Sequence, residues 1–377
     1  MSEITSQEVT NMSGKPIVGM IEMQFVMLLF LLGSAIILGL GLDAGEYSWL
    51  ANVLAGVTGL LLFNLYVYIW NENHHQGLNP ILTAQFGKHL GFIISAVYAV
   101  YFAYIASRVL NDIVHFINST LLHNMHPFFI KFTIFLLIIY TYSKGLEPFV
   151  RSAVIFGSVT LLFLLLIPFF IVLSSNFHID YITPFHSLDV KKIVKTVFPT
   201  LITFPYGELV VSLALLPFLK EKKSLSKGGS IVIVISTFLL SIFSFLTIGV
   251  LHPDLAKSYS YPLVTTIEHI GLIGFFQRLD ILAVIIFMIG CYFKITVFTF
   301  ASIFVAKDCM NKWKVNNNSL VSTVFLAIIA FSYLYSDNNS LHVKIGLELV
   351  PFLLHVPLQI VVPLLIVMIT FVRGKFA

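Results

Sequence analysis

Charge is scarce in this sequence. Only 11% of its 377 residues are Asp, Glu, Lys or Arg, whereas 58% are hydrophobic and the mean hydropathy is +0.94. A soluble globular domain carries roughly 25% charged residues and about half apolar residues. A water-soluble core cannot bury so much apolar sequence, so the composition predicts that a lipid bilayer surrounds most of the chain.

Cysteine and clustered basic residues are also nearly absent. Cys291 and Cys309 are too few for a disulfide framework, and no Cys/His spacing typical of metal sites occurs. The formal net charge is only +4, and no basic stripe alternates with aromatic residues, so nucleic acid is not an expected partner. The loops hold no nucleophile–base pair and no phosphate-binding loop, so we expect no enzymatic activity, cofactor or metal.

Long apolar runs dominate what remains. A helix needs about 20 apolar residues to cross a bilayer, and runs of this length recur along the chain. They predict an all-α integral membrane protein with about ten transmembrane helices, nine or eleven being the alternatives. The eighth run is too long for one span, and its start near 265–274 is interpreted as a surface helix. The predicted spans lie near residues 20–42, 48–70, 90–116, 128–142, 152–173, 193–217, 229–250, 272–306, 319–335 and 350–372.

Lysine and arginine are divided unequally between the two sets of loops. The larger set lies in short loops and marks the cytoplasmic side, which we call the lysine-rich side. Both termini are then cytoplasmic, residues 1–19 forming a cytoplasmic tail and 20–377 a single transmembrane permease-like domain. The run 191–195 lies on the other side and is interpreted as an amphipathic surface helix. The lysine-rich side comprises Lys88, Lys144, Arg151, Lys220, Lys222, Lys223, Lys227, Lys307, Lys312, Lys314, Arg373 and Lys375.

Two predicted spans contain residues that interrupt helices. Span one contains Gly33-Ser34 and then Gly39-Leu40-Gly41, and span six contains Phe204-Pro205-Tyr206-Gly207-Glu208. Proline lacks a backbone donor and glycine tolerates non-helical dihedral angles. In many transporters the first helix of each inverted five-helix repeat is broken at the substrate site. The matched breaks predict a LeuT-like 5+5 inverted repeat around a solute site, the alternative being a plain proline kink and small packing residues.

Ionisable residues inside apolar spans are costly and are therefore functional candidates. Glu208 and Lys294 have no partner nearby in the sequence, so each must face a polar cavity or a distant partner. Their pairing with each other is one open solution. Three further pairs are interpreted as structural clamps or interfacial anchors, because residues four apart share a helix face and residues near a span end reach the interface. These pairs are Arg108 with Asp112, Glu147 with Arg151, and Arg278 with Asp280.

Taken in order, several stretches resemble the integral-membrane B subunit of bacterial spore germinant receptors, the GerAB/GerBB-type spore germination permeases. The resemblance extends over essentially the whole chain, and it is the order and spacing of the motifs that make it specific. Two positions depart from the family pattern, Phe287 and the Tyr-Ser-Lys before Gly145. The stretches are Gly33-Ser34 followed by Trp49-Leu50, Tyr142 to Glu147 with Arg151, Phe204 to Glu208, and Phe276 to Asp280 followed by Lys294.

The resemblance implies a ten-helix fold of the amino acid–polyamine–organocation superfamily in the inner membrane of a dormant spore. It also implies A and C subunits as partners and a role in sensing a nutrient: an amino acid, a sugar or a nucleoside. By position, the implied ligand pocket would contain Gly33, Ser34, Tyr98, Phe102, Pro205, Gly207, Glu208 and Lys294.

Three functions of different classes follow from this sequence. The leading hypothesis is a nutrient-sensing receptor subunit, in which binding at the two helix breaks favours one conformation. The alternatives are a solute/cation symporter of the same fold and a conduit for water or ions that opens when ligand binds.

Overall fold

Helices account for nearly all of the regular structure. The computed structural model describes residues 17–174, 176–182, 189–269, 280–311, 315–334 and 339–376, and within these ranges it contains helices and no strand. Eight helical segments there are long and apolar enough to cross a membrane, judged by length and composition. The prediction of an all-α integral membrane protein is confirmed. The inverted repeat stays a prediction.

Within the described residues, the first part of the chain forms four of the eight long segments, together with the shorter helices α2 and α4. The break after the first helix is occupied by turns and by the 3-10 segment η1. In chain order the elements are α2 (Met20–Leu32), η1 (Leu42–Tyr47), α3 (Ser48–Glu72), α4 (Leu78–Phe86), α5 (Lys88–Thr120), α6 (Pro127–Lys144) and α7 (Leu146–Leu173).

The second part contains more irregular helix. The sixth predicted span is composed of α8 (Val190–Thr196), the π-helical η3 (Val197–Tyr206) and the 3-10 η4 (Gly207–Ala214). It is followed by η5 (Leu216–Phe218), η6 (Lys222–Ser224), α9 (Leu225–Leu251), α10 (Pro253–Ser258), α11 (Pro262–Glu268), α12 (Asp280–Met310), α13 (Asn317–Tyr333) and α14 (Asn339–Lys344). The chain ends with η9 (Ile345–Leu349), η10 (Pro351–Val361) and α15 (Val362–Phe376).

Helix bounds differ from the sequence prediction in two places. The first predicted span is helical only to Leu32, because the backbone turns from Gly33 onward. The surface helix predicted near 265–274 overlaps α11, which runs from Pro262 to Glu268 and buries Leu263, Val264 and Ile267. Residues 270–279, which include the end of the predicted surface helix and Arg278, lie outside the described residues. The predicted lysine-bearing surface helix is α8, where Lys191, Lys192 and Lys195 are exposed.

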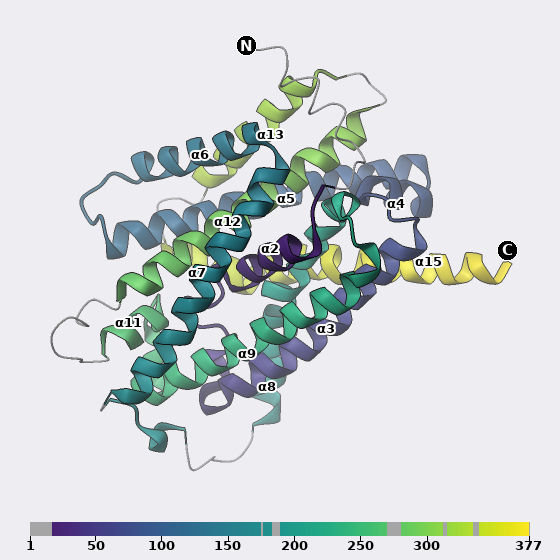
Figure 1. Ribbon diagram of the computed structural model, residues 1–377. Coiled ribbons are helices and arrows are strands. Elements are labelled where there is room, and N and C mark those ends of the chain that lie inside the picture. The colour runs from purple at the N-terminus through teal and green to yellow at the C-terminus, as the bar shows by residue number, and fades with distance from the viewer. Residues whose placement is uncertain are drawn as a thin grey trace.

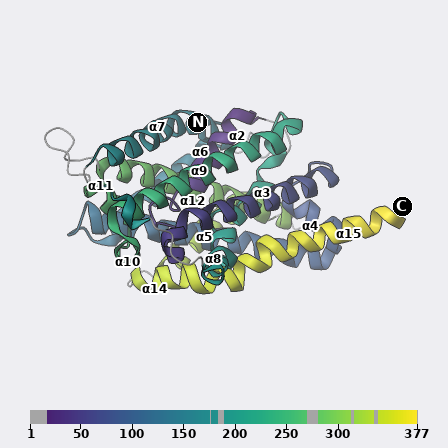
Figure 2. The same ribbon diagram turned by 90° about the horizontal axis from the view of Figure 1, so that it is seen from below.

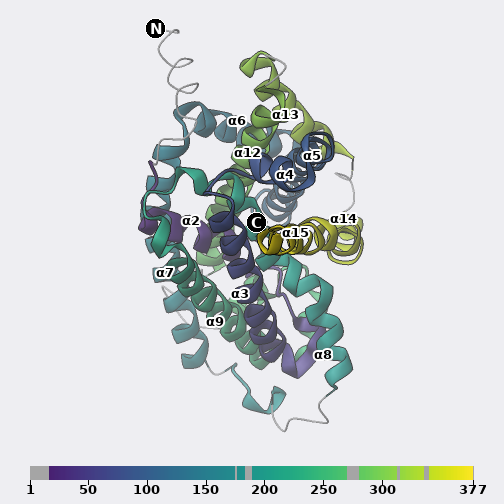
Figure 3. The ribbon, with the colours of Figure 1, turned by 90° about the vertical axis from the view of Figure 1, so that its right-hand side faces the viewer.

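The helices pack into one bundle that encloses α2 and α12 on several sides. Helix α12 lies along α5, and α3 lies along α9, while α2 contacts α7, α9 and α12 (Figure 1). In Figure 2, α2 and α7 lie on one side of the bundle and the segment from α14 to α15 lies on the opposite side. Figure 3 looks nearly along α5 and α15 and shows α3 beside α9 in the lower half of the bundle.

Helices α2 and α12 approach most closely through two glycines. A Cβ added to Gly290 of α12 would lie 2.5 Å from the Cα of Gly33 at the end of α2. Small residues at such crossings let helix backbones approach each other and pack well in lipid, where no hydrophobic effect drives helices together. This crossing places the first helix break directly against the middle of α12.

Gly290→Ala is expected to destabilise the protein by about 1–3 kcal/mol. The added methyl group would meet the backbone of Gly33, which cannot move aside as easily as a flexible side chain. The matched control is Gly77→Ala, since a Cβ there has its nearest neighbour at an ordinary 3.6 Å. Thermal unfolding of the purified protein in detergent measures both. Equal melting temperatures for the two variants would contradict the close α2–α12 crossing.

Candidate functional site

The first helix break lies between α2 and α3. From Gly33 to Gly41 the chain forms turns, and Gly39 and Gly41 have φ values of +64° and +90°, which favour glycine. The Asn52 side-chain amide donates to the carbonyl oxygen of Leu40 at 3.0 Å and so holds the turn. Ser34 is fully buried in this break, and its hydroxyl has no hydrogen-bond partner among the described residues.

The second break lies in the sixth span. Phe198 and Phe204 have extended backbone conformations, with φ/ψ of −110°/131° and −125°/112°, inside what is otherwise helix. The irregular segment η3 ends at Tyr206, and η4 begins at Gly207. Non-helical backbone is tolerated at membrane depth only inside the protein; here Pro199, Thr203 and Pro205 are buried, whereas the Phe198 side chain is 47% exposed. Both interruptions expected from the sequence are therefore present.

Glu208 and Lys294 form an ion pair between η4 and α12. The Lys294 Nζ lies 2.6 Å from the Glu208 Oε2, and the two side chains are 0% and 2% exposed. Neither of these two atoms has a further hydrogen-bond partner within the described ranges. Lys294 is near the middle of α12, so the pair lies far from either end of that helix. The ion pair between Glu208 and Lys294, which the sequence gave as one possible solution, is therefore present.

Aromatic rings surround the ammonium group of Lys294. Its Nζ lies 4.2 Å from the centroid of the Phe204 ring and 5.3 Å from that of Phe30. Such cation–π contacts contribute about 2 kcal/mol or more when the cation is desolvated. The Phe298 ring lies between those of Phe30 and Phe102: its centroid is 5.1 Å from the Phe30 centroid and 6.1 Å from the Phe102 centroid. Phe102, which the resemblance implies as a pocket residue, therefore reaches the pair through a chain of rings.

The remaining implied pocket residues border the same place. Gly33 abuts α12 one turn before Lys294, and a Cβ on Gly207 would lie 2.2 Å from the Gln359 Oε1. The buried Tyr98 hydroxyl donates to the carbonyl oxygen of Leu358. Gly33, Glu208 and Lys294 thus lie where the two breaks meet α12, whereas Tyr98 contacts η10.

Sequence reasoning missed the contribution of the last span. Gln359 in η10 donates from Nε2 to the Tyr101 hydroxyl at 2.7 Å, while its Oε1 has no partner among the residues described. Both ring nitrogens of buried His355 are likewise unpartnered, and the ring lies 5.9 Å from that of Tyr101. The Tyr66 hydroxyl lies 2.7 Å from the Gln359 carbonyl oxygen and so joins α3 to η10. A histidine and a glutamine beside Pro357 in an apolar run were the available signal.

Two of the predicted charge pairs can be located. Arg151 and Glu147 form an exposed ion pair of 2.6 Å on α7. Arg108 and Asp112 instead converge on His342: Asp112 Oδ1 lies 2.8 Å from His342 Nε2, and Arg108 donates to the His342 carbonyl oxygen. The described residues contain no direct ion pair between Arg108 and Asp112, so the clamp joins α5 to α14 and not to itself. Arg278, the partner expected for Asp280, lies outside the described residues.

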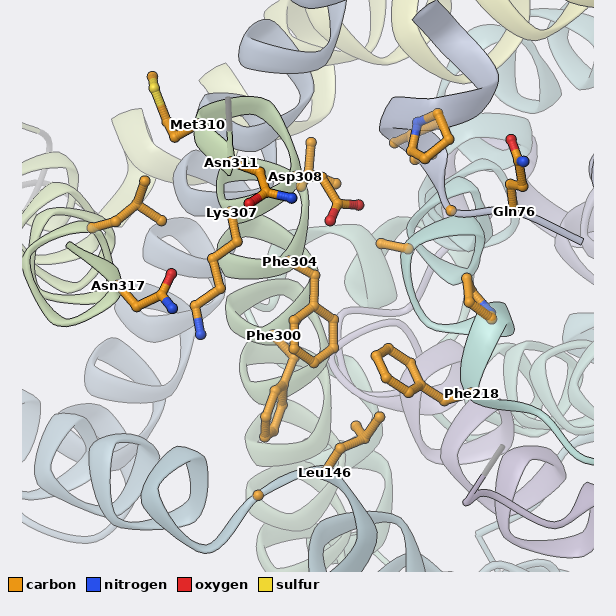
Figure 4. A pocket seen from close by; sticks show the side chains of 18 of the residues that line it. Gln76, Leu146, Phe218, Phe300, Phe304, Lys307, Asp308, Met310, Asn311 and Asn317 are labelled. Carbon is orange, nitrogen blue, oxygen red and sulfur yellow. The ribbon is translucent and has the colours of Figure 1, made fainter. Parts of the chain in front are cut away.

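A cavity of about 760 Å³ opens between the ends of several helices. Phe300 and Phe304 of α12 and Phe218 of η5 project into it, and Lys307 and Asp308 lie on the same helix near its mouth (Figure 4). Tyr142, Lys222 and Lys307 all line it, so residues expected on the lysine-rich side do meet at one end of the bundle. Ala214, the last residue of η4, lines this cavity. Along the helix axis it lies roughly 9–12 Å from Glu208 near the start of η4.

Burial and, to a smaller extent, the charge of Lys222 lower the pKa of His75 at the edge of this cavity. His75 is therefore neutral near pH 7 and leaves the two lysines as the cations of the lining. The Lys307 Nζ donates to the Tyr142 hydroxyl at 3.2 Å.

Comparison with known proteins decides the family. Residues 18–341 match a protein family described as "Spore germination protein". The chain belongs to this family. The resemblance found in the sequence is confirmed for most of its length.

Relatives from Bacillus subtilis (strain 168) extend the match. The chain is 29% identical to Spore germination protein KB over 357 residues, which cover 94% of this chain and 95% of that protein. It is 26% identical to Spore germination protein B2 over 62% of this chain and 63% of that protein. It is 21% identical to Spore germination protein A2 over 81% of this chain and 85% of that protein. The match to protein KB thus extends over nearly the whole of both chains.

Removing one member of the Glu208–Lys294 pair is expected to destabilise the protein more than removing both. Lys294→Met leaves a buried carboxylate unpaired, which costs about 3–5 kcal/mol, whereas adding Glu208→Gln removes that charge. Unfolding of both single variants and the double variant in mixed micelles yields the coupling free energy. Additive losses in the double variant would contradict a direct interaction between the two side chains.

Proposed function

We propose that this protein is the membrane-embedded, nutrient-sensing subunit of a spore germinant receptor. A small solute such as an amino acid binds at mid-membrane, between the two helix breaks and α12, and triggers germination. The observation that carries this proposal is the fully buried Glu208–Lys294 pair, with unpartnered polar atoms of Ser34, His355 and Gln359 in the surrounding residues. Buried polar groups in proteins are almost always satisfied, so a group of orphans around one ion pair calls for a ligand.

The helix breaks supply the means of response. Irregular segments lose fewer intrahelical hydrogen bonds than a regular helix when they move, and η3–η4 contacts α3, α12 and η10. A solute that binds one arrangement of these contacts more tightly shifts the population toward it. Partner subunits of the A and C type then detect the shifted bundle.

The same proposal places the protein in the spore inner membrane, with residues 1–19 and the C-terminus in the cytoplasm and residues 20–377 as one permease-like domain. Its support is the excess of lysine on one side of the bundle, where Lys222 and Lys307 line a common cavity. Eight apolar spans and the family match support the multi-pass membrane location.

A second candidate function is transport by the same fold, as a solute/cation symporter or a ligand-opened conduit. The observation that favours it is the cavity lined by Lys222 and Lys307. Ala214 also lines this cavity and belongs to η4, the same short helix as Glu208. Proteoliposomes that contain this chain alone distinguish the two candidates. A sensing subunit binds labelled amino acids without accumulating them, whereas saturable, gradient-driven uptake would establish the carrier.

Ser34→Ala tests the sensing proposal without disturbing a protein hydrogen bond, because the Ser34 hydroxyl has no partner among the described residues. We expect normal protein levels and a germination response that requires about five- to tenfold more nutrient, the effect of one lost hydrogen bond to ligand. The matched control is Ser236→Ala, since Ser236 is an equally buried, unpartnered serine on α9, which contributes no residue to the site.

The readout is the dose–response curve of spores that carry each variant in the native operon, with the protein quantified in their membranes. An unchanged curve for Ser34→Ala, or an equal shift for Ser236→Ala, would remove Ser34 and the first break from the proposed site.

A further inference from the structure

A second hollow, which we call the α5 groove, lies between α5, α13 and η10 and has a volume of about 490 Å³. Its floor is formed by α5 residues from Phe92 to Tyr104, and its walls by Phe331 of α13 and by Leu354 and Leu358 of η10. In Figure 3, α5 lies between α13 and α15, the helix that continues η10. Helix α5 and the segment from η10 to α15 are each long and apolar enough to cross a membrane. The groove therefore lies within the bilayer.

Apolar side chains and aromatic rings line the α5 groove. Ile93, Val97 and Val100 on its floor are 45–56% exposed, so no other part of the described chain covers them. The rings of Tyr104 and Phe331 meet edge to face, 5.9 Å apart between centroids, where the groove reaches the middle of α5. Water does not fill a hollow of this kind, because apolar cavities stay dry. An apolar molecule or segment from the membrane must fill it instead.

The length of the groove matches one leaflet of a bilayer. From Phe92 to Tyr104 the axis of α5 rises roughly 18 Å, and half of a hydrocarbon core is about 15 Å thick. The groove begins one turn after Lys88, on the lysine-rich side, and ends at mid-membrane. A transmembrane helix is about 10–12 Å wide with its side chains, so roughly 18 Å of it fills about 1,400 Å³. The groove is too small for a helix, whereas a single extended acyl chain is narrow enough to lie inside it.

Basic groups lie at the end of the groove on the lysine-rich side. Lys88 and His89, in the first turn of α5, are exposed and lie one helical turn before the first groove residues. Arg373 of α15 donates from Nη1 to the carbonyl oxygen of Ala84, at 2.8 Å, in the helix that leads into α5. Within the described ranges no carboxylate forms an ion pair with Lys88 or Arg373. Helix α5 also begins without a side-chain cap, so its first backbone N–H groups add partial positive charge. This end of the groove therefore favours an anionic group.

We propose that the α5 groove is a binding site for an anionic phospholipid from the leaflet on the lysine-rich side. One acyl chain lies along α5 in the groove, and the phosphate group lies at Lys88, His89 and Arg373. The acyl chain is held by apolar burial and by dispersion contacts with the lining. The headgroup is held by charge, to which each basic residue near a membrane surface contributes. Long basic side chains at the end of a span reach the headgroup level.

The lipid supports the contact between α5 and the last span. Tyr101 and Leu358 line the groove, and each also takes part in a hydrogen bond that joins α5 to η10. The Tyr101 hydroxyl accepts from Gln359 Nε2 at 2.7 Å, and the carbonyl oxygen of Leu358 accepts from the Tyr98 hydroxyl. Without an occupant the lining loses its dispersion contacts on one side. An acyl chain in the groove therefore holds η10 against α5, and η10 in turn contacts the broken sixth span.

The first experiment maps lipid contacts on the whole protein in phosphatidylcholine nanodiscs. A trace of phospholipid with a photoactivatable acyl chain is added, with either a phosphatidylglycerol or a phosphatidylcholine headgroup, and labelled peptides are identified by mass spectrometry. We expect the phosphatidylglycerol probe to label the groove residues of α5 and η10 at least fivefold more than the phosphatidylcholine probe, the effect of one basic residue or more. The lipid-facing side of α7 is expected to take up both probes equally. Equal labelling of the groove by the two probes overturns the proposal.

The second experiment changes each end of the groove separately. Val97→Trp fills the floor of the groove and is expected to abolish its labelling, whereas Val159→Trp places the same ring on α7, at a valine of similar exposure, and leaves the groove labelled. Lys88→Gln is expected to lower the preference for the phosphatidylglycerol probe about fivefold. Its matched control is Lys227→Gln, at an exposed lysine in the first turn of α9 on the same side, which leaves the preference unchanged. Undiminished groove labelling in Val97→Trp places the lipid elsewhere and overturns the proposal.

The same labelling, repeated on the protein in complex with its partner subunits, tests the other occupant that the groove could take. Retained labelling by the phosphatidylglycerol probe supports a lipid site. Loss of this labelling, together with cross-links from the groove to a partner's transmembrane helix, assigns the groove to protein and overturns the proposal. Because the comparison of headgroups uses wild-type protein, it remains decisive even where a variant fails to fold.

Discussion

The pairing of two charges at the centre of the bundle is the constraint on which the rest of the structure depends. Glu208 and Lys294 can remain ionised there only as each other's partners, because isolated charges in a dry interior are too costly. Their contact requires that the second half of the broken span and the middle of α12 lie side by side. The close crossing of Gly33 and Gly290 brings the first break to the same level of α12. The two helix breaks and the two buried charges therefore lie together at the middle of α12.

The irregular backbone is tolerated because other elements cover it. The π and 3-10 segments of the sixth span are buried against α3, α12 and η10, where Tyr66 bridges the carbonyl oxygens of Gly207 and Gln359. In lipid every backbone polar group needs a partner inside the protein, so broken helices require such side-chain contacts. The last span is thus part of the site and not a peripheral anchor. The last span also contains a π-helical stretch of its own, η10.

Local signals in the sequence predicted the spans, the two breaks and the residues that form them, because each depends on neighbouring residues alone. Long-range pairing was less accessible. Arg108 and Asp112, four residues apart, were expected to pair, yet both contact His342 from a segment 230 or more residues away. Gln359 and His355 were overlooked because a single polar residue in an apolar run has no pattern to mark it. The pairing of Glu208 with Lys294 was correctly named as a solution, but only the packing of η4 on α12 selects it.

The unpartnered atoms near Glu208 and Lys294 set this buried pair apart from the exposed pair on α7. The pair between Arg151 and Glu147 is water-accessible, so solvent satisfies whatever the pair itself leaves open. Water has no comparable access to Glu208 and Lys294, and the neighbouring Ser34, Gln359 and His355 groups do not bond to them. A purely structural role would favour apolar residues of similar volume at these positions, since such replacements often stabilise a buried core. Two buried charges, unpartnered polar atoms and two helix breaks lie together here, and the proposed binding site rests on this combination.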